Sequence, residues 1–293
     1  MESNRMKKAP RDAYWMLAPL AAVVLALVAF PTLYAYSVSL LDARLSSDAA
    51  PFIGLHNYAS ALTNPSFYGS IAYSAKFALL ATVAELIAGI ALAVLFNRTF
   101  RGKGIATSLM LLPLMVAPSL FALIFRLMLN EFVGLIPFYF SRLGIPLNPF
   151  DPTWVNATLV IIDALQWVPF VFIIVYAGLT TIPEELYEAA RVDGATAWQT
   201  FATITLPLLV PTIATAAFLR GIDAFKIYDM IYVLTNGGPG ELTTSVSLFI
   251  YKKAFLEGNI GEASAASILL TFVLAPVLGL AMKYVVKSGR EGV

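Results

Sequence analysis

Long apolar segments are the feature that most constrains how this chain can fold. Six of them hold about 20 or more mostly apolar residues, the length at which a helix spans the hydrocarbon core of a bilayer. The segments are residues 14–40, 71–96, 105–129, 154–179, 208–235 and 263–286. One ordinary soluble core cannot bury them all. We therefore expect an all-α membrane protein with six transmembrane helices.

The composition supports lipid as the solvent. Of the 293 residues, 59% are hydrophobic and 13% are charged, whereas soluble domains are about 45–50% apolar and about 25% charged. Mean hydropathy is +0.79. The absence of cysteine excludes disulfides, thiolate metal sites and a cysteine nucleophile. The single histidine, His56, lies in a polar segment, so we expect it at the surface, and the net charge of +1 argues against a nucleic-acid partner.

Basic residues predict the orientation of the chain in the membrane, because cytoplasmic flanks are enriched in lysine and arginine. A cytoplasmic N-terminus followed by six crossings puts three basic clusters on one side. These are Arg5, Lys7, Lys8 and Arg11, then Arg98, Arg101 and Lys103, and finally Lys283, Lys287 and Arg290. We therefore expect both termini in the cytoplasm. The first apolar segment exceeds the length of a signal-peptide core, so we expect it to be retained.

One polar segment, residues 188–207, lies between the fourth and fifth apolar segments and is too charged to cross lipid. A proline and two glutamates just before it suit the first turn of a helix. Gly194 is expected to stop that helix, because glycine tolerates the left-handed conformation of a helix end. Thr196 then opens a second short helix that ends at Leu206 and Pro207. On the residues alone, the segment is an amphipathic connector at the cytoplasmic membrane surface.

The same segment carries a spaced pattern, E-A-A-x3-G-x9-I-x-L-P, that resembles the EAA loop of ABC-importer permeases. The seven fixed positions are Glu188, Ala189, Ala190, Gly194, Ile204, Leu206 and Pro207. The resemblance implies that residues 180–207 form cytoplasmic coupling helices that dock into a groove on an ATPase subunit. It assigns ATPase contact to the glutamate and the bend to the glycine, and Asp193 belongs to the same implied coupling set.

Other stretches extend the resemblance over most of the chain. Residues 52–58, FIGLHNY, are similar to an element after the first span of carbohydrate-type permeases. Residues 223–239, which end in Gly-Gly-Pro, resemble their fifth span and outer loop, and residues 251–267 continue the likeness. The resemblance implies a type I importer (MetI-like) permease fold in one transmembrane domain, residues 1–293, with a core of about 70–287.

Membership of that family implies a function and a set of partners. The chain would supply half of an alternating-access path for a carbohydrate, in the inner membrane of a bacterium or archaeon. The implied partners are a second permease subunit, two copies of a cytoplasmic ABC ATPase and an extracytoplasmic solute-binding protein. No G-x4-G-K-[ST] sequence occurs, so we expect ATP and magnesium on the ATPase, and neither a cofactor nor an enzymatic activity on this chain.

Charged residues inside apolar segments are costly in lipid and normally face protein or water. They are Glu85, Arg126, Asp163, Arg220, Asp223, Lys226 and Asp229. The last four alternate in sign every three residues, so on one continuous helix they are expected to pair in series. Two interpretations stay open: buried ion pairs that hold helices together, or side chains that line the translocation path.

The fourth and fifth apolar segments are also rich in aromatic residues. Sugars present C–H faces that pack on aromatic rings, and their hydroxyls need polar partners. The candidate substrate path is Asp163, Gln166, Trp167, Phe170, Arg220, Asp223, Phe225 and Tyr228. The alternative is that these aromatic rings fill helix packing or form interfacial belts.

Two other classes of protein fit the sequence less well. A secondary transporter driven by an ion gradient would use the carboxylates of Glu85, Asp163 and Asp223 as ion sites. The EAA-like loop and the modest number of spans argue against it. An intramembrane enzyme is disfavoured because one histidine and no cysteine give no catalytic or metal cluster.

Overall fold

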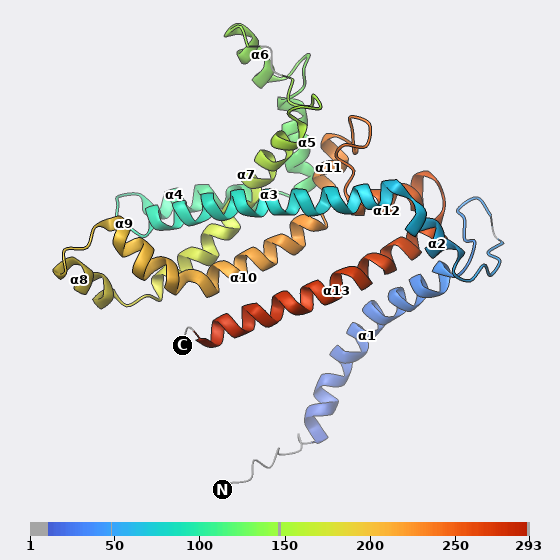
Figure 1. The fold of residues 1–293 in the computed structure, drawn as a ribbon, viewed down its shortest axis with the longest axis horizontal. Helices are drawn as coiled ribbons and strands as arrows, with labels where there is room; N and C mark the ends of the chain where they lie inside the picture. The colour runs from blue at the N-terminus through green and yellow to red at the C-terminus, as the bar shows by residue number, and fades with distance from the viewer. Residues whose placement is uncertain (1–10, 48, 146–147, 292–293) are drawn as a thin grey trace. The chain divides into compact units, whose positions relative to one another are not determined.

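The structure is a computed structural model that describes residues 11–47, 49–145 and 148–291 (Figure 1). Helices dominate these residues, and the β interactions among them are two isolated bridges. The chain divides into two compact units. The first is Met1–Thr63 with Ile250–Phe272, and the second is Asn64–Phe249 with Val273–Val293. The basic residues Arg5, Lys7 and Lys8 lie outside the described residues.

The first unit contains α1 (Arg11–Ser39), α2 (His56–Thr63), η3 (Lys252–Leu256) and the start of α13 (Ile260–Glu291). Buried Asn57 joins α2 to the end of α1, because its side-chain amide donates to the carbonyls of Ser39 at 2.9 Å and Leu41 at 2.8 Å. The backbone N–H of Gly261 donates to the carbonyl of Ala43 at 3.1 Å. Asn57 of the FIGLHNY stretch therefore anchors α2 to the end of α1, and a separate backbone bond holds residue 43 to the start of α13.

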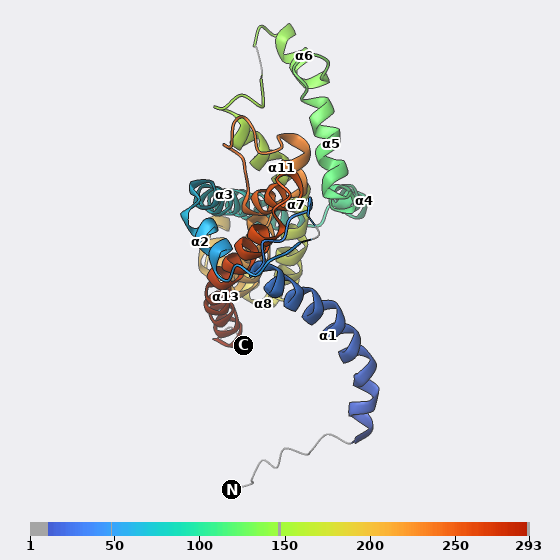
Figure 2. The same cartoon turned by 90° about the vertical axis from the view of Figure 1, so that its right-hand side faces the viewer.

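The second unit is built on three long helices, of which α3 packs against both others (Figures 1 and 2). Its elements are α3 (Pro65–Phe96), α4 (Lys103–Leu111), η1 (Leu112–Met115), α5 (Pro118–Met128), α6 (Leu135–Arg142), α7 (Val155–Thr180), α8 (Glu184–Val192), α9 (Ala197–Thr200), η2 (Phe201–Thr205), α10 (Leu206–Phe225), α11 (Asp229–Leu234) and most of α12 (Val246–Tyr251). The three long helices are α3, α7 and α10, and they carry the residues that matter below.

Close approach of α3 to α7 depends on Gly89. A Cβ atom at this position would lie 2.6 Å from Cγ1 of Val171 and 2.8 Å from its Cβ, so there is no room for a side chain. Two apolar clusters of buried residues follow along these helices. One is centred on Phe77, Leu159 and Ile162, and the other includes Phe172 and buried residues of α10.

Four helices of the described residues are long and apolar enough to cross a membrane: Trp15–Ser39, Pro65–Phe96, Val155–Thr180 and Ala197–Phe225. The all-α membrane character is thus confirmed. A fifth span results if Lys103–Met115 and Pro118–Met128 are counted as one. The sixth predicted segment, 263–286, lies within α13, whose described apolar part is Ile260–Pro276. The count of six stays a prediction.

The third predicted segment, 105–129, is wrong as a continuous helix. The chain bends by 95° between Lys103–Met115 and Pro118–Met128. Pro113 and Pro118 lack the N–H groups that would continue the helical hydrogen bonds. The amide of Gln166 on α7 donates to the carbonyl of Val116 at 3.0 Å, so a distant helix satisfies a carbonyl that the bend releases.

The fifth predicted segment, 208–235, is also interrupted. Helix α10 ends at Phe225, and α11 begins only at Asp229. Hydroxyl groups of Ser245 and Ser247 donate to the carbonyls of residues 227 and 226 at 2.6 and 3.0 Å, which satisfies the backbone at the break. Arg220 pairs with Asp223 as expected. The series does not continue to Asp229, because Asp229 lies on a different helix.

Candidate functional site

Helix α8 forms the first half of the predicted coupling segment, and Gly194 stops it. Gly194 has φ of +73°, a left-handed conformation that glycine adopts without strain. Its N–H donates to the carbonyl of Arg191 at 3.2 Å, and the N–H of Ala195 donates to the carbonyl of Ala190 at 2.9 Å. This pair of bonds is the Schellman motif of helix ends. The predicted helix stop at Gly194 is confirmed.

Thr196 opens the next helix, as predicted. Its hydroxyl accepts from the N–H of Gln199 at 3.3 Å, and the Gln199 side chain accepts from the N–H of Thr196 at 2.8 Å. This reciprocal pair is a capping box. The predicted end of the helix at Leu206 and Pro207 is wrong, because helix continues from Ala197 to Phe225.

The π-helical turn η2 explains how the helix passes the proline. The N–H of Leu206 donates to the carbonyl of Phe201, five residues back. This wider turn changes the hydrogen-bond pattern just before Pro207, which has no N–H of its own to donate.

The motif residues divide into exposed and buried positions. Ala190 is buried, Ile204 and Leu206 are partly buried, and the others are exposed: Glu188, Ala189, Asp193, Gly194 and Pro207. The side chain of Glu188 is 63% exposed, and its nearest cation is Arg191 at 3.8 Å. A surface pair at this distance contributes little to stability. Glu188 is therefore available to a partner.

A cavity of about 830 Å³ lies between α8 and the ends of α3 and α7. Its lining includes Arg98, Glu184, Tyr187 and Arg191. Tyr187 reaches across it, because its hydroxyl lies 3.2 Å from the hydroxyl of Thr205. A hydroxyl contact thus joins α8 to the helix that continues from Ala197 to Phe225.

A buried charge cluster forms where α3, α7 and α10 meet. Arg220 of α10 donates to Glu85 of α3 at 2.5 and 2.7 Å, and to Asp163 of α7 at 2.8 Å. It also donates to Asp223, one turn along α10, at 2.7 Å. Arg220, Glu85 and Asp163 are at most 3% exposed, whereas the side chain of Asp223 is 54% exposed. Along each of α3, α7 and α10, the charged residues lie between residues of the first apolar cluster and residues of the second.

Aromatic rings adjoin this cluster on one side. The guanidinium of Arg220 lies 4.6 Å from the centroid of the Trp167 ring, a cation–π contact. Phe170 packs edge-on against Trp167. The structure therefore brings together Asp163, Trp167, Phe170, Arg220 and Asp223 of the candidate path.

The other three residues of the candidate path contact other parts of the molecule. Gln166 is buried and bonds the carbonyl at the α4–α5 bend. Phe225 packs against the apolar cluster of Phe77. Tyr228 lies beyond the end of α10 and stacks on Tyr232.

Comparison with known proteins identifies the family. Residues 85–290 match the family described as "Binding-protein-dependent transport system inner membrane component". The chain belongs to this family. The match contains both the coupling segment and the charge cluster, and it establishes an inner-membrane component of a transport system.

Curated members of this family resemble the chain over nearly its whole length. It is 38% identical to the trehalose/maltose transport system permease protein MalF of Thermococcus litoralis, over 94% of this chain and 93% of that one. It is 31% identical to the trehalose transport system permease protein SugA of Mycobacterium tuberculosis, over 96% and 92%. A solved bacterial importer of the polysaccharide alginate contains a chain of the same fold, with a TM-score of 0.81, 22% identity, and coverage of 94% and 95%.

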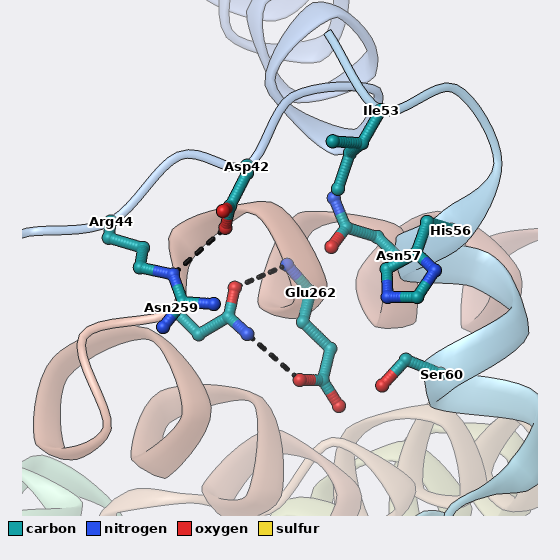
Figure 3. A pocket seen from close by; sticks show the side chains of 8 residues that line it. All are labelled: Asp42, Arg44, Ile53, His56, Asn57, Ser60, Asn259 and Glu262. Carbon is teal, nitrogen blue, oxygen red and sulfur yellow. Dashed lines mark hydrogen bonds and ion pairs between the residues drawn. The ribbon is translucent and has the colours of Figure 1, made fainter. Parts of the chain in front are cut away.

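The first unit of this family member also holds a polar pocket of about 650 Å³ (Figure 3). Its lining residues are Asp42, Arg44, Ile53, His56, Asn57, Ser60, Asn259 and Glu262. The hydrogen bond to Asp42 raises the pKa of Arg44 above its ordinary value. Glu262 is buried, and Asn259 donates to it at 3.0 Å. His56 is exposed, as expected from its polar surroundings.

Sequence reasoning missed one of the three carboxylate partners of Arg220, Glu85. Glu85 was noted as a charge inside an apolar segment but was not placed in the candidate site. No sequence pattern predicts that Glu85 pairs with Arg220, since 135 residues separate the two. Tyr187 was also missed, although it directly precedes the motif glutamate. Arg126 proved to bond the carbonyl of Val233 at 2.8 Å.

Proposed function

We propose that this chain is the permease subunit of an ATP-driven, binding-protein-dependent importer for a carbohydrate. The observation that carries the proposal is the coupling segment: α8, its glycine stop and the capped helix after it form a helix–turn–helix with Glu188 exposed. The relatives named for trehalose and maltose transport support a sugar as the substrate class. No other function is favoured by a specific observation.

The proposed assembly contains four kinds of component besides lipid. This chain pairs with a second permease subunit, and two copies of a cytoplasmic ABC ATPase bind ATP and magnesium. An extracytoplasmic solute-binding protein delivers the sugar; one solved relative of the same fold is described in complex with a periplasmic protein that holds an alginate pentasaccharide. Both termini and the coupling segment are on the cytoplasmic side in this proposal.

Within the membrane, we assign two roles to the charge cluster. Glu85, Asp163 and Arg220 hold α3, α7 and α10 together, because they are shielded from water and bonded to one another. Asp223 and the neighbouring Trp167 are the members with exposed or partly exposed surface. They offer a carboxylate and a ring face, the two kinds of group that a sugar needs.

Two substitutions test the coupling role. Gly194→Val strains a left-handed backbone position, and Glu188→Lys reverses an exposed charge. We expect both variants to insert normally but to lose ATPase co-purification or substrate-stimulated ATP hydrolysis in reconstituted vesicles. Gly102→Val is the matched control for the first variant, since Gly102 has φ of +82° and lies outside the coupling segment. Arg101→Glu is the control for the second, since it reverses an exposed charge outside the coupling segment.

The control variants should keep co-purification and stimulation. Full uptake and full stimulation in both Gly194→Val and Glu188→Lys would show that the segment is only a surface connector. If only Gly194→Val loses membrane expression, Glu188→Lys alone tests the coupling role. Glu188→Lys changes an exposed side chain and leaves the backbone conformation unchanged.

A further inference from the structure

Tyr187 and Thr205 connect the coupling helix to the start of a transmembrane helix. Tyr187 lies on α8, immediately before Glu188, and is half-buried. Thr205 is the last residue of η2 and is 5% exposed. Their hydroxyl groups are 3.2 Å apart, across 18 residues of sequence. Among the residues that the structure describes, no other side-chain hydrogen bond joins α8 to another element.

The bond meets the chain at the π-helical turn, where the N–H of Leu206 donates five residues back to Phe201. Such turns are often found at functional sites, because they depart from the regular helical bonding on either side. Beyond this turn, α10 continues to Arg220, which joins α10 to α3 and α7 through the buried charge cluster. If Thr205 shifts along the helix axis, α10 is therefore expected to shift Arg220 and the buried charge cluster with it.

We infer that Tyr187 and Thr205 are positioning residues that transmit movement of α8 to α10. This inference rests on the proposed function of α8 as the coupling helix. Without the bond, α8 is held to α10 mainly through the loop at Gly194, whose left-handed turn separates the two helices. Movement driven by the ATPase is then absorbed in the loop instead of rotating or shifting α10.

The test uses the complete importer reconstituted in lipid vesicles, with sugar uptake and ATP hydrolysis measured on the same preparation. Tyr187→Phe and Thr205→Val each remove one hydroxyl with little change in shape. We expect each to lower uptake per ATP hydrolysed by about fivefold, the effect of losing one net hydrogen bond. The double variant should lose no more than either single variant, since both remove the same contact.

Two further variants separate positioning from folding. Thr205→Ser keeps the hydroxyl and should restore the ratio of uptake to hydrolysis. Thr203→Val removes an exposed hydroxyl two residues away, which bonds only the local carbonyl of Gln199 at 2.7 Å, and should leave the ratio unchanged.

Two results would overturn the inference. One is an unchanged ratio in both Tyr187→Phe and Thr205→Val, and the other is an equal fall of uptake and hydrolysis, which marks a purely structural role. Glu188→Lys, measured in parallel, distinguishes failure of the proposed function from failure of the inference about Tyr187 and Thr205. If it uncouples the importer while Tyr187→Phe does not, the proposed function stands and only this inference fails. If neither variant has an effect, the proposed function fails as well.

Discussion

Arg220 and Glu85 form a two-point ion pair, in which Nε and Nη2 of the arginine donate to the two carboxylate oxygens of the glutamate. The arginine is 1% exposed and the glutamate 0%. Asp163 and Asp223 share the same guanidinium. One cation thus serves three carboxylates, and two of those have no access to water in this conformation.

The first prediction concerns this unequal burial. Arg220→Gln should destabilise the protein by about 3–5 kcal/mol, because it leaves two buried carboxylates without a cation. Asp223→Asn should cost about 1 kcal/mol or less, since that side chain is half-exposed and is not enclosed like Glu85 and Asp163. Thermal unfolding of the purified protein in detergent measures both. Equal losses in the two variants would show that Asp223 is as enclosed as its neighbours.

The second prediction concerns the contact between α3 and α7. Gly89→Ala should destabilise by about 1–3 kcal/mol, because its Cβ overlaps the side chain of Val171. Gly69→Ala on the same helix is the control, since a Cβ there meets nothing within 4 Å. The pair Gly89→Ala with Val171→Gly removes both atoms that the new Cβ overlaps, so it should recover part of the loss relative to the sum of the two single variants. No recovery would mean that Val171 is not the obstructing residue.

The third prediction separates two roles of Gln166. Gln166→Leu leaves the carbonyl of Val116 without its donor, so the melting temperature should fall by the equivalent of about 1–3 kcal/mol. The apparent KM for sugar uptake should not change if the side chain only supports the bend. An increased KM with an unchanged melting temperature would instead place Gln166 in the substrate path.

The fourth prediction concerns orientation. The natural chain has no cysteine, so single introduced thiols can be labelled without background. Phe132→Cys and Thr99→Cys change exposed residues in connections that six crossings put on opposite sides. An impermeant maleimide added to intact cells should label the first and not the second until the membrane is opened. Labelling of both from one side would contradict the proposed topology.

Local chemistry explains what could be predicted from the sequence. Mean hydropathy over about 20 residues is a property of neighbours along the chain, so the membrane segments were located without knowledge of the fold. The stop at Gly194 and the cap at Thr196 are equally local, because their hydrogen bonds join residues within one or two turns. The 95° bend near Pro113 and Pro118 is not local in this sense, because a carbonyl at the bend is bonded by Gln166 from a distant helix.

Only the tertiary structure decided which polar groups meet. The sequence favoured a series along one helix, in which Arg220 pairs with Asp223 and Lys226 with Asp229; the first pair forms, but Lys226 and Asp229 do not share a helix. The helix ends at Phe225, and serine hydroxyls from residues 245 and 247 bond the carbonyls of residues 227 and 226 just beyond its end. Glu85 and Asp163, 135 and 57 residues away, then complete the coordination of Arg220. Such partners are set by how three helices pack, because the cost of an unpaired buried charge depends on distant neighbours and not on adjacent residues.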